Sequence, residues 1–116
     1  MASKYRNTGQ TCVCANRIYV QAGVYDDFVA RLSKAVLAMK VGDGLQGETQ
    51  QGPLINMAAA EKVEEHLADA TSQGAKIAVG GNRHSLGGTF FDPTILTEAT
   101  QDMKGAKETH FRTPAT

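Results

Sequence analysis

Two stretches of the sequence repeat their apolar residues at steps of three and four, and this periodicity constrains the fold most strongly. The first predicts a helix over 24–39 whose apolar stripe consists of Tyr25, Phe28, Val29, Leu32, Val36 and Met39. The second predicts a helix over 58–73 with an inner face of Ala60, Val63, Leu67 and Ala70, an N-cap at Asn56 and a stop at Gly74. Each stripe has to be buried, so other elements must pack onto both helices.

Three shorter segments, 17–21, 76–79 and 89–96, have the composition of strands, although Pro93 places an edge position or a bend in the last one. The order strand, helix, helix, strand favours an α/β domain with a right-handed parallel crossover. A chain of 116 residues has room for one domain.

The charge balance excludes two classes of partner. The chain has 12 basic and 12 acidic residues, and its formal net charge is zero. Without a basic run there is no electrostatic reason to expect nucleic acid or an anionic membrane as a partner. No stretch is apolar enough for a membrane span or a signal peptide, so we expect a soluble, cytoplasmic protein.

The two cysteines, Cys12 and Cys14, lie one residue apart near the N-terminus. A disulfide between cysteines at this spacing cannot link distant parts of a domain, which argues against a secreted disulfide framework. The three histidines (His66, His84 and His110) are scattered, so no metal site is expected. Taken alone, the cysteine pair is either two small buried side chains or the source of a reactive thiol.

The residues before Cys12 favour the reactive alternative. Residues 6–12 read RNTGQTC, which suits a loop that delivers a thiol at the start of a short helix. Free backbone N–H groups there favour the thiolate and can stabilise an oxyanion on a carbonyl substrate. Lys4 and Arg6 are candidates for holding an anionic group of that substrate, although a lone Arg is more commonly a solvated surface charge.

Residues 4–17, KYRNTGQTCVCANR, resemble the cysteine motif of the aldehyde dehydrogenase superfamily, and 6–14 is closest to its succinate-semialdehyde dehydrogenase branch. Further blocks follow in the family's order: VGDGL (41–45), GPLI (52–55), KVEEH (62–66) and GGTFFDPTIL (87–96). The resemblance implies an α/β fold: a partial three-layer αβα fragment of the catalytic domain with a mostly parallel sheet. We expect this fragment to span residues 1–108, followed by a divergent, flexible tail over 109–116.

The resemblance also implies roles for individual residues. Cys12 matches the catalytic nucleophile, which attacks a small aldehyde substrate to give a thiohemiacetal that NAD or NADP then oxidises. The backbone N–H of Cys12 would form half of the oxyanion hole. Arg6 matches the arginine that binds the distal carboxylate of succinate semialdehyde. Cys14 matches a second cysteine of that branch, and its proximity to Cys12 suggests a redox partner that could switch the nucleophile off.

Parts of the family's machinery are expected to be missing from this chain. We find no Gly-x-Gly-x-x-Gly motif, no general-base glutamate in its Glu-Leu-Gly-Gly context, and neither the oxyanion-hole asparagine nor the oligomerisation segment. Residues 107–114, KETHFRTP, also depart from the family's Glu-Glu-x-Phe-Gly-Pro, whose second Glu binds a cofactor ribose. We therefore expect no cofactor to be bound by this chain alone, although the full-length family uses NAD or NADP.

Three functions remain open from the sequence. The chain is a truncated succinate-semialdehyde dehydrogenase fragment with negligible oxidation activity on its own, a self-associating non-enzymatic binding domain, or a residual thiol-dependent esterase. Because apolar helix faces and sheet edges would be left uncovered, we also expect a homo-oligomer, a dimer or larger.

Overall fold

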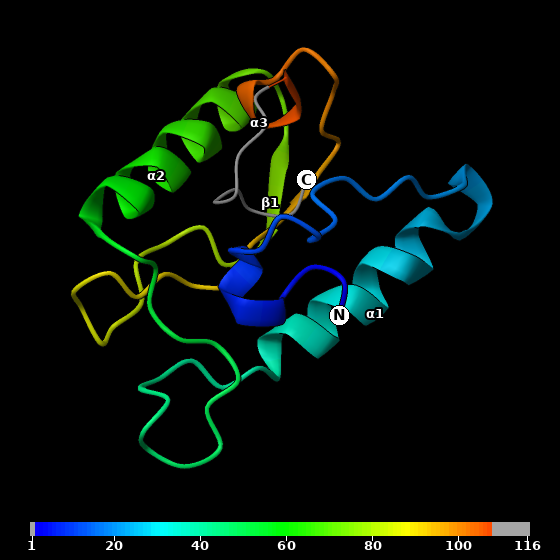
Figure 1. The fold of residues 1–116 in the computed structure, drawn as a ribbon. Coiled ribbons are helices and arrows are strands. Elements are labelled where there is room, and N and C mark those ends of the chain that lie inside the picture. Colours follow the sequence, from blue (N-terminus) through cyan, green and yellow to red (C-terminus); the bar gives the residue numbers. More distant parts are fainter. Residues whose placement is uncertain (1, 108–116) are drawn as a thin grey trace.

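The computed structural model describes residues 2–107. In chain order its elements are η1 (Arg6–Gly9), η2 (Ala22–Val24), α1 (Tyr25–Leu37), α2 (Met57–Ser72), β1 (Lys76–Val79), β2 (Ile95–Thr97) and α3 (Lys104–Lys107). Figure 1 shows the two long helices apart from each other, with the strands between them. The predicted tail over 109–116 and His110 lie outside the described residues.

Both predicted helices are confirmed to within two residues at each end. The N-terminus of α2 is capped as expected, because the Asn56 side chain accepts a hydrogen bond from the Ala59 N–H at 2.9 Å. At the other end Gly74 has a φ of +100° and its N–H bonds to the Thr71 carbonyl. Glycine tolerates this left-handed conformation at little cost, which explains why the helix stops there.

The sheet consists of two antiparallel strands, β1 and β2, joined by the long connection 80–94. A bulge between Ile77 and Val79 shifts the register, so that Ile77 lies opposite Leu96 and Val79 lies opposite Ile95. The predicted strand over 89–96 is therefore shorter and starts only after Pro93, which supplies no N–H to a ladder.

The expected mostly parallel sheet is not found among residues 2–107. Segment 17–21, the predicted first strand, is extended but pairs with no other strand in that part of the chain. Two parallel strands have to be joined by a crossover connection. The connection 80–94 instead folds back on itself, so β2 runs antiparallel to β1. The α/β content itself agrees with the prediction.

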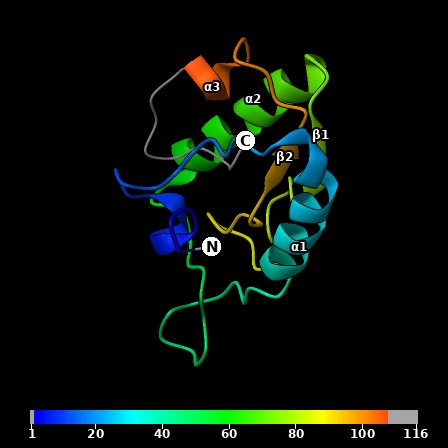
Figure 2. The ribbon, with the colours of Figure 1, turned by 90° about the vertical axis from the view of Figure 1, so that its right-hand side faces the viewer.

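The core has two parts, one on each face of the strand pair, and Figure 2 shows the strands between α2 and α1. Successive side chains of a strand point to opposite faces, so Leu96 joins the α2 side and Ile95 joins the α1 side. On the α2 side the whole predicted inner face of that helix is buried. His66 is also buried there, at 2% exposure.

The predicted stripe of α1 is only partly covered. Val36 is buried, but Phe28 remains 36% exposed and the other stripe residues are half-buried. The described part of the chain therefore leaves one amphipathic helix without a complete partner. Within residues 2–107 no helix combines the length and the apolar character needed to cross a membrane.

Candidate active site

The two cysteines belong to a loop, residues 3–16, whose backbone has an unusual conformation (the cysteine loop). Asn7, Thr8 and Gly9 have φ values of +49°, +57° and +73°, and this left-handed run forms the kinked element η1. Asparagine and glycine adopt such values readily, whereas the β-branched Thr8 does so at a cost of about 1–3 kcal/mol. A conformation of this kind persists only where surrounding contacts hold it.

Those contacts come from residues 51–55. The buried Gln51 side chain donates to the Tyr5 carbonyl at 2.6 Å, and the Thr8 hydroxyl donates to the Gly52 carbonyl at 3.3 Å. Gln10 bonds through both ends of its amide: Nε2 donates to the Pro53 carbonyl and Oε1 accepts from the backbone N–H of residue 55, at 3.3 and 3.0 Å. The cysteine loop is thus fixed by a second loop about 45 residues further along the chain.

These anchoring residues were not identified as functional from the sequence. Gln51 lies in a Gly- and Gln-rich stretch that reads as an ordinary surface loop, yet it is 2% exposed. The sequence feature that could have identified an anchoring residue is the position of Gln10, directly before Thr11 and Cys12. Tyr5 adds a further anchor, because its hydroxyl donates to the Thr94 carbonyl at 3.1 Å and ties the loop to the residue before β2.

Cys12 is exposed and its thiol is free. It lies in a turn closed by the hydrogen bond from the Cys14 N–H to the Thr11 carbonyl at 3.1 Å, and no helix begins there. The expectation of a short helix at this point is therefore wrong. In the described part of the chain the Cys12 N–H donates no hydrogen bond, so it is available to a substrate oxygen.

Cys14 is half-buried and also free, but its thiol is engaged. The sulfur lies 2.7 Å from the Thr11 hydroxyl and donates to the Arg6 carbonyl at 3.6 Å. Through these contacts the Cys14 thiol connects Thr11 to Arg6. The structure therefore brings all three predicted site residues into one loop, with Cys14 at its interior.

The two basic residues of the loop differ in accessibility. The Arg6 side chain is exposed and forms no ion pair among the residues described, which leaves it available to an anion. Lys4 is only 3% exposed, and its ammonium donates to Asn16 Oδ1 at 3.1 Å. Burial lowers the pKa of Lys4 to about 8, a shift that the nearby Cys14 opposes. The prediction that Lys4 helps to hold a substrate anion is therefore wrong, because the side chain faces the protein interior.

A dinucleotide cofactor does not fit the residues present. A pyrophosphate binds best at a helix N-terminus behind a glycine-rich turn. The first turn of α1 carries Asp26 and Asp27, whose charges repel phosphate, and the N-terminus of α2 is occupied by the Asn56 side chain. The glycines of loop 80–88 lead into strand β2 and not into a helix.

Three comparisons place these residues among known proteins. The model of the aldehyde dehydrogenase family matches residues 1–113, and the match continues into the segment predicted as a divergent tail. The 3-sulfolactaldehyde dehydrogenase of Pseudomonas putida is 53% identical over 96% of this chain and 23% of its own length. The succinate-semialdehyde dehydrogenase [NADP(+)] GabD of Escherichia coli K12 is also 53% identical, with the same shares covered.

The fold agrees with solved structures of the same kind. The crystal structure of succinate-semialdehyde dehydrogenase from Burkholderia pseudomallei matches with a TM-score of 0.93 and 53% identity. The match covers 97% of this chain and 24% of that one. The chain thus spans about a quarter of the length of the proteins it matches.

Proposed function

Since the chain belongs to the aldehyde dehydrogenase family, we propose that it is the nucleophile-bearing part of a catalytic domain that oxidises small anionic aldehydes with NAD or NADP. In this proposal Cys12 is the nucleophile and Arg6 binds the anionic end of the substrate. The observation that carries it is the exposed Cys12 thiol on a loop held by hydrogen bonds, with the exposed Arg6 side chain in the same loop.

The first chemical step needs only groups of the cysteine loop. The Cys12 sulfur gives up its proton and forms a bond to the aldehyde carbon, while the π electrons of the carbonyl move to its oxygen. The backbone N–H of Cys12 is free to stabilise that oxygen as it becomes negative. The oxygen then takes up a proton, and the product is a neutral thiohemiacetal.

The preference for an anionic aldehyde rests on Arg6. A guanidinium binds a carboxylate or a sulfonate through two parallel hydrogen bonds, so it orients the substrate as well as attracting it. The relatives named above act on sulfolactaldehyde and succinate semialdehyde, both of which carry such a group at the far end from the aldehyde. Arg6 is exposed and therefore accessible to a group of this kind.

Completion of the reaction requires more than these residues. Oxidising the thiohemiacetal needs a hydride acceptor, and the described residues do not fit one. No side chain of the cysteine loop is placed as a general base in the contacts described either. We therefore expect this chain alone to form the adduct without producing the acid.

The decisive experiment replaces the part of E. coli GabD that matches residues 1–107 by those residues, keeps GabD's own sequence after it, and measures succinate-semialdehyde oxidation with NADP. We expect the chimera to be active and the Cys12→Ala variant to fall below detection. Arg6→Met should lower kcat/KM for succinate semialdehyde about 10- to 100-fold, the worth of a charge-assisted hydrogen bond of about 1.5–3 kcal/mol. Butanal, which has no anionic end, is the control substrate and should be affected far less.

The exposure of Cys12 also favours a second function, a weak thiol-dependent esterase. Attack on an activated ester needs neither cofactor nor hydride acceptor, so this activity is open to the chain alone. Release of nitrophenol from nitrophenyl acetate, lost in Cys12→Ala and kept in Cys14→Ala, would support it. Equal rates for the two variants would eliminate it.

Cys14 offers a means of control over Cys12. We propose that an oxidant such as diamide, which accepts two electrons and two protons, joins the two thiols in a disulfide and blocks the nucleophile. Cys14 would first have to leave its contacts with Thr11 and Arg6. Because the bond would close a very small loop, we expect it to be strained and easily reduced. Thiol counting before and after diamide tests the idea, and two free thiols after treatment would exclude it.

A further inference from the structure

The backbone on both sides of Arg6 is held by side chains from elsewhere in the fold. On its N-terminal side, Nε2 of the buried Gln51 donates to the Tyr5 carbonyl at 2.6 Å. On its C-terminal side, the Cys14 thiol donates to the carbonyl of Arg6 itself at 3.6 Å. Each of the two planar peptide groups that flank the Arg6 Cα atom therefore has a partner. Together these contacts fix the direction in which the Arg6 side chain leaves the backbone.

The Cys14 thiol also reaches the turn that carries Cys12. Its sulfur lies 2.7 Å from the Thr11 hydroxyl, and the Cys14 N–H donates to the Thr11 carbonyl at 3.1 Å. Cys12 lies inside this turn, directly after Thr11. One side chain thus contacts both the backbone of the cation and the neighbour of the nucleophile. The spacing between Arg6 and Cys12 is therefore restricted by contacts at both of its ends.

Gln51 is itself firmly held, which lets it position the peptide group that it binds. Its backbone N–H donates to the Lys40 carbonyl at 3.1 Å, and its carbonyl accepts from the Gly42 N–H at 2.9 Å. The side-chain Nε2 makes a second bond, to the Gln50 carbonyl at 2.9 Å. The residue is only 2% exposed. Water cannot readily replace a buried donor, so loss of the amide would leave the buried Tyr5 carbonyl without its partner.

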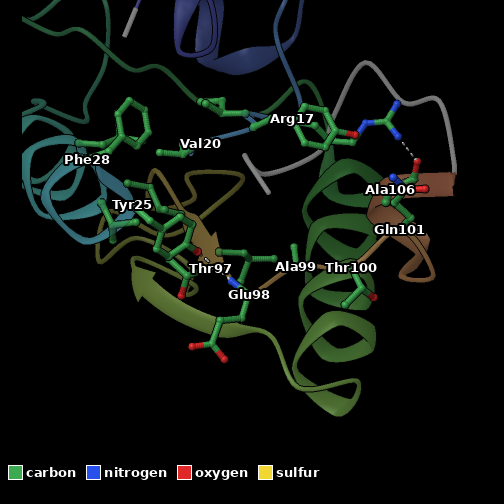
Figure 3. A pocket seen from close by; sticks show the side chains of 16 residues that line it. Arg17, Val20, Tyr25, Phe28, Thr97, Glu98, Ala99, Thr100, Gln101 and Ala106 are labelled. Atoms are coloured by element: carbon green, nitrogen blue, oxygen red, sulfur yellow. Dashed lines mark hydrogen bonds between the residues drawn. The ribbon is translucent and has the colours of Figure 1, made fainter. Parts of the chain in front are cut away.

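A second arginine, Arg17, follows the cysteine loop but is engaged elsewhere. It lies at one end of a groove between segment 17–20, α1 and β2, where it donates to the Ala106 carbonyl at 2.9 Å (Figure 3). None of the residues that line this groove belongs to the cysteine loop. The nearby Lys4 is buried against Asn16. Arg6 is therefore the basic residue of the loop whose direction matters for an anionic substrate.

We propose that Gln51 and Cys14 are positioning residues that determine the preference for aldehydes with a carboxylate or sulfonate at the far end. They fix the peptide groups on either side of Arg6 and so hold its guanidinium where it can bind that group while the aldehyde carbon meets Cys12. This inference rests on the proposed function, because both residues act through Arg6 and neither touches the substrate. Loss of either should weaken the selection of anionic aldehydes more than the reaction with an uncharged one.

The test uses the GabD chimera that carries residues 1–107 of this chain. The measured quantity is the ratio of kcat/KM for succinate semialdehyde to kcat/KM for butanal, which we call the anion preference. Gln51→Met removes the donor but keeps the length of the side chain, and it should lower the anion preference about 2- to 10-fold, the factor that one neutral hydrogen bond contributes.

Cys14 allows an independent test that does not disturb the buried position 51. Cys14→Ala should lower the anion preference by a similar factor. Cys14→Ser should keep most of it, because a hydroxyl can donate to the Arg6 carbonyl as the thiol does. Rescue by serine separates the hydrogen bond from the effect of changing the residue.

Thr89→Val is the matched control. The half-buried Thr89 hydroxyl donates to the Leu54 carbonyl at 2.7 Å, so it holds the same second loop without bonding to a peptide group beside Arg6. Its loss should leave the anion preference unchanged. Each variant is also combined with Arg6→Met, and the combination should have the anion preference of Arg6→Met alone. A residue that acts through Arg6 has nothing left to position once the guanidinium is gone.

The possible failures are distinguishable. If Arg6→Met leaves the anion preference unchanged, Arg6 does not bind the substrate, and both the proposed role of Arg6 and this inference are overturned. If Arg6→Met lowers it while Gln51→Met and Cys14→Ala do not, only the positioning inference is overturned. A loss in Gln51→Met that persists in full beside Arg6→Met, or that Thr89→Val reproduces, identifies a general structural effect and also overturns the inference.

Discussion

Replacing Gly80 by alanine should destabilise the fold more than an equivalent change at any other glycine for which the structure gives the surroundings. Gly80 follows β1 and has a φ of +71°. A Cβ atom at this position would lie 2.4 Å from the Pro93 carbonyl oxygen and 2.8 Å from the Thr94 hydroxyl. The backbone oxygen cannot rotate away, so the chain before β2 would have to move.

The expected cost has two parts. A left-handed conformation costs a residue with a Cβ about 1–2 kcal/mol relative to glycine. Forcing an extra carbon into a packed position adds about 1–3 kcal/mol. The sum is about 2–5 kcal/mol, a large share of the stability of about 5–15 kcal/mol that is typical of a domain.

Two other glycines separate these contributions. Gly74 also has a positive φ, +100°, but a Cβ there meets nothing within 4 Å, so Gly74→Ala should cost about 1–2 kcal/mol. Gly44 has neither a positive φ nor a close neighbour, so Gly44→Ala should change stability by less than about 1 kcal/mol in either direction. The difference between the first two variants isolates the steric part.

Urea denaturation followed by circular dichroism at the helix signal measures all three variants, since the chain has no Trp for fluorescence. If Gly80→Ala and Gly74→Ala lose the same stability within error, the steric argument at Pro93 is refuted. Gly80→Ala should also expose the cysteine loop. The Tyr5 hydroxyl donates to the Thr94 carbonyl, and this carbonyl should move together with Pro93 in that variant. Cys12 alkylation should then show altered kinetics in Gly80→Ala and unaltered kinetics in Gly74→Ala.

Further predictions concern the core, a helix cap and pH. Leu67→Ala removes a buried side chain of α2 and should cost about 2–5 kcal/mol in urea denaturation, whereas Leu45→Ala at 93% exposure should cost less than about 0.5 kcal/mol. Asn56→Ala removes the cap of α2 and should cost about 1 kcal/mol; no loss would mean that water replaces the side chain. Burial lowers the pKa of Lys4 from 10.5 to about 8, so the unfolded chain binds more protons between these values and stability should rise as pH increases from about 8 to 10.5. Burial raises the pKa of Tyr5 from 10.0 to about 12, so the folded chain holds its proton longer and stability should fall from about pH 10 to 12. Urea midpoints across pH 7–12 test both, because Lys4→Met should flatten the rise and Tyr5→Phe the fall.

Several features of the site could be anticipated from neighbouring residues alone. The cysteine motif placed Cys12, Cys14 and Arg6 in one loop; Cys12 and Arg6 are exposed and Cys14 contacts the Arg6 carbonyl, while the roles of the three residues stay predictions. The anchors Gln10 and Gln51 could not be anticipated in the same way. Their hydrogen bonds cross more than 40 residues of chain, and no local pattern records which distant carbonyl a side chain will meet.

Burial was the property that local patterns predicted least well. Lys4 looked like a substrate contact because it is charged and close to Cys12, yet tertiary packing buries it against Asn16. The α1 stripe looked like core, yet much of it remains partly exposed because the described residues supply too little surface to cover it. Both outcomes depend on which other segments fold onto a position.

Local sequence accounts for the two long helices, the cap at Asn56 and the stop at Gly74, because helical periodicity and capping depend on residues within a few positions of each other. The pairing of strands depends on the whole chain: 76–79 pairs with 95–97 in antiparallel register, and 17–21 enters no ladder within residues 2–107. Strand composition shows that a segment can pair. Which strand it pairs with depends on how the chain between the two segments folds.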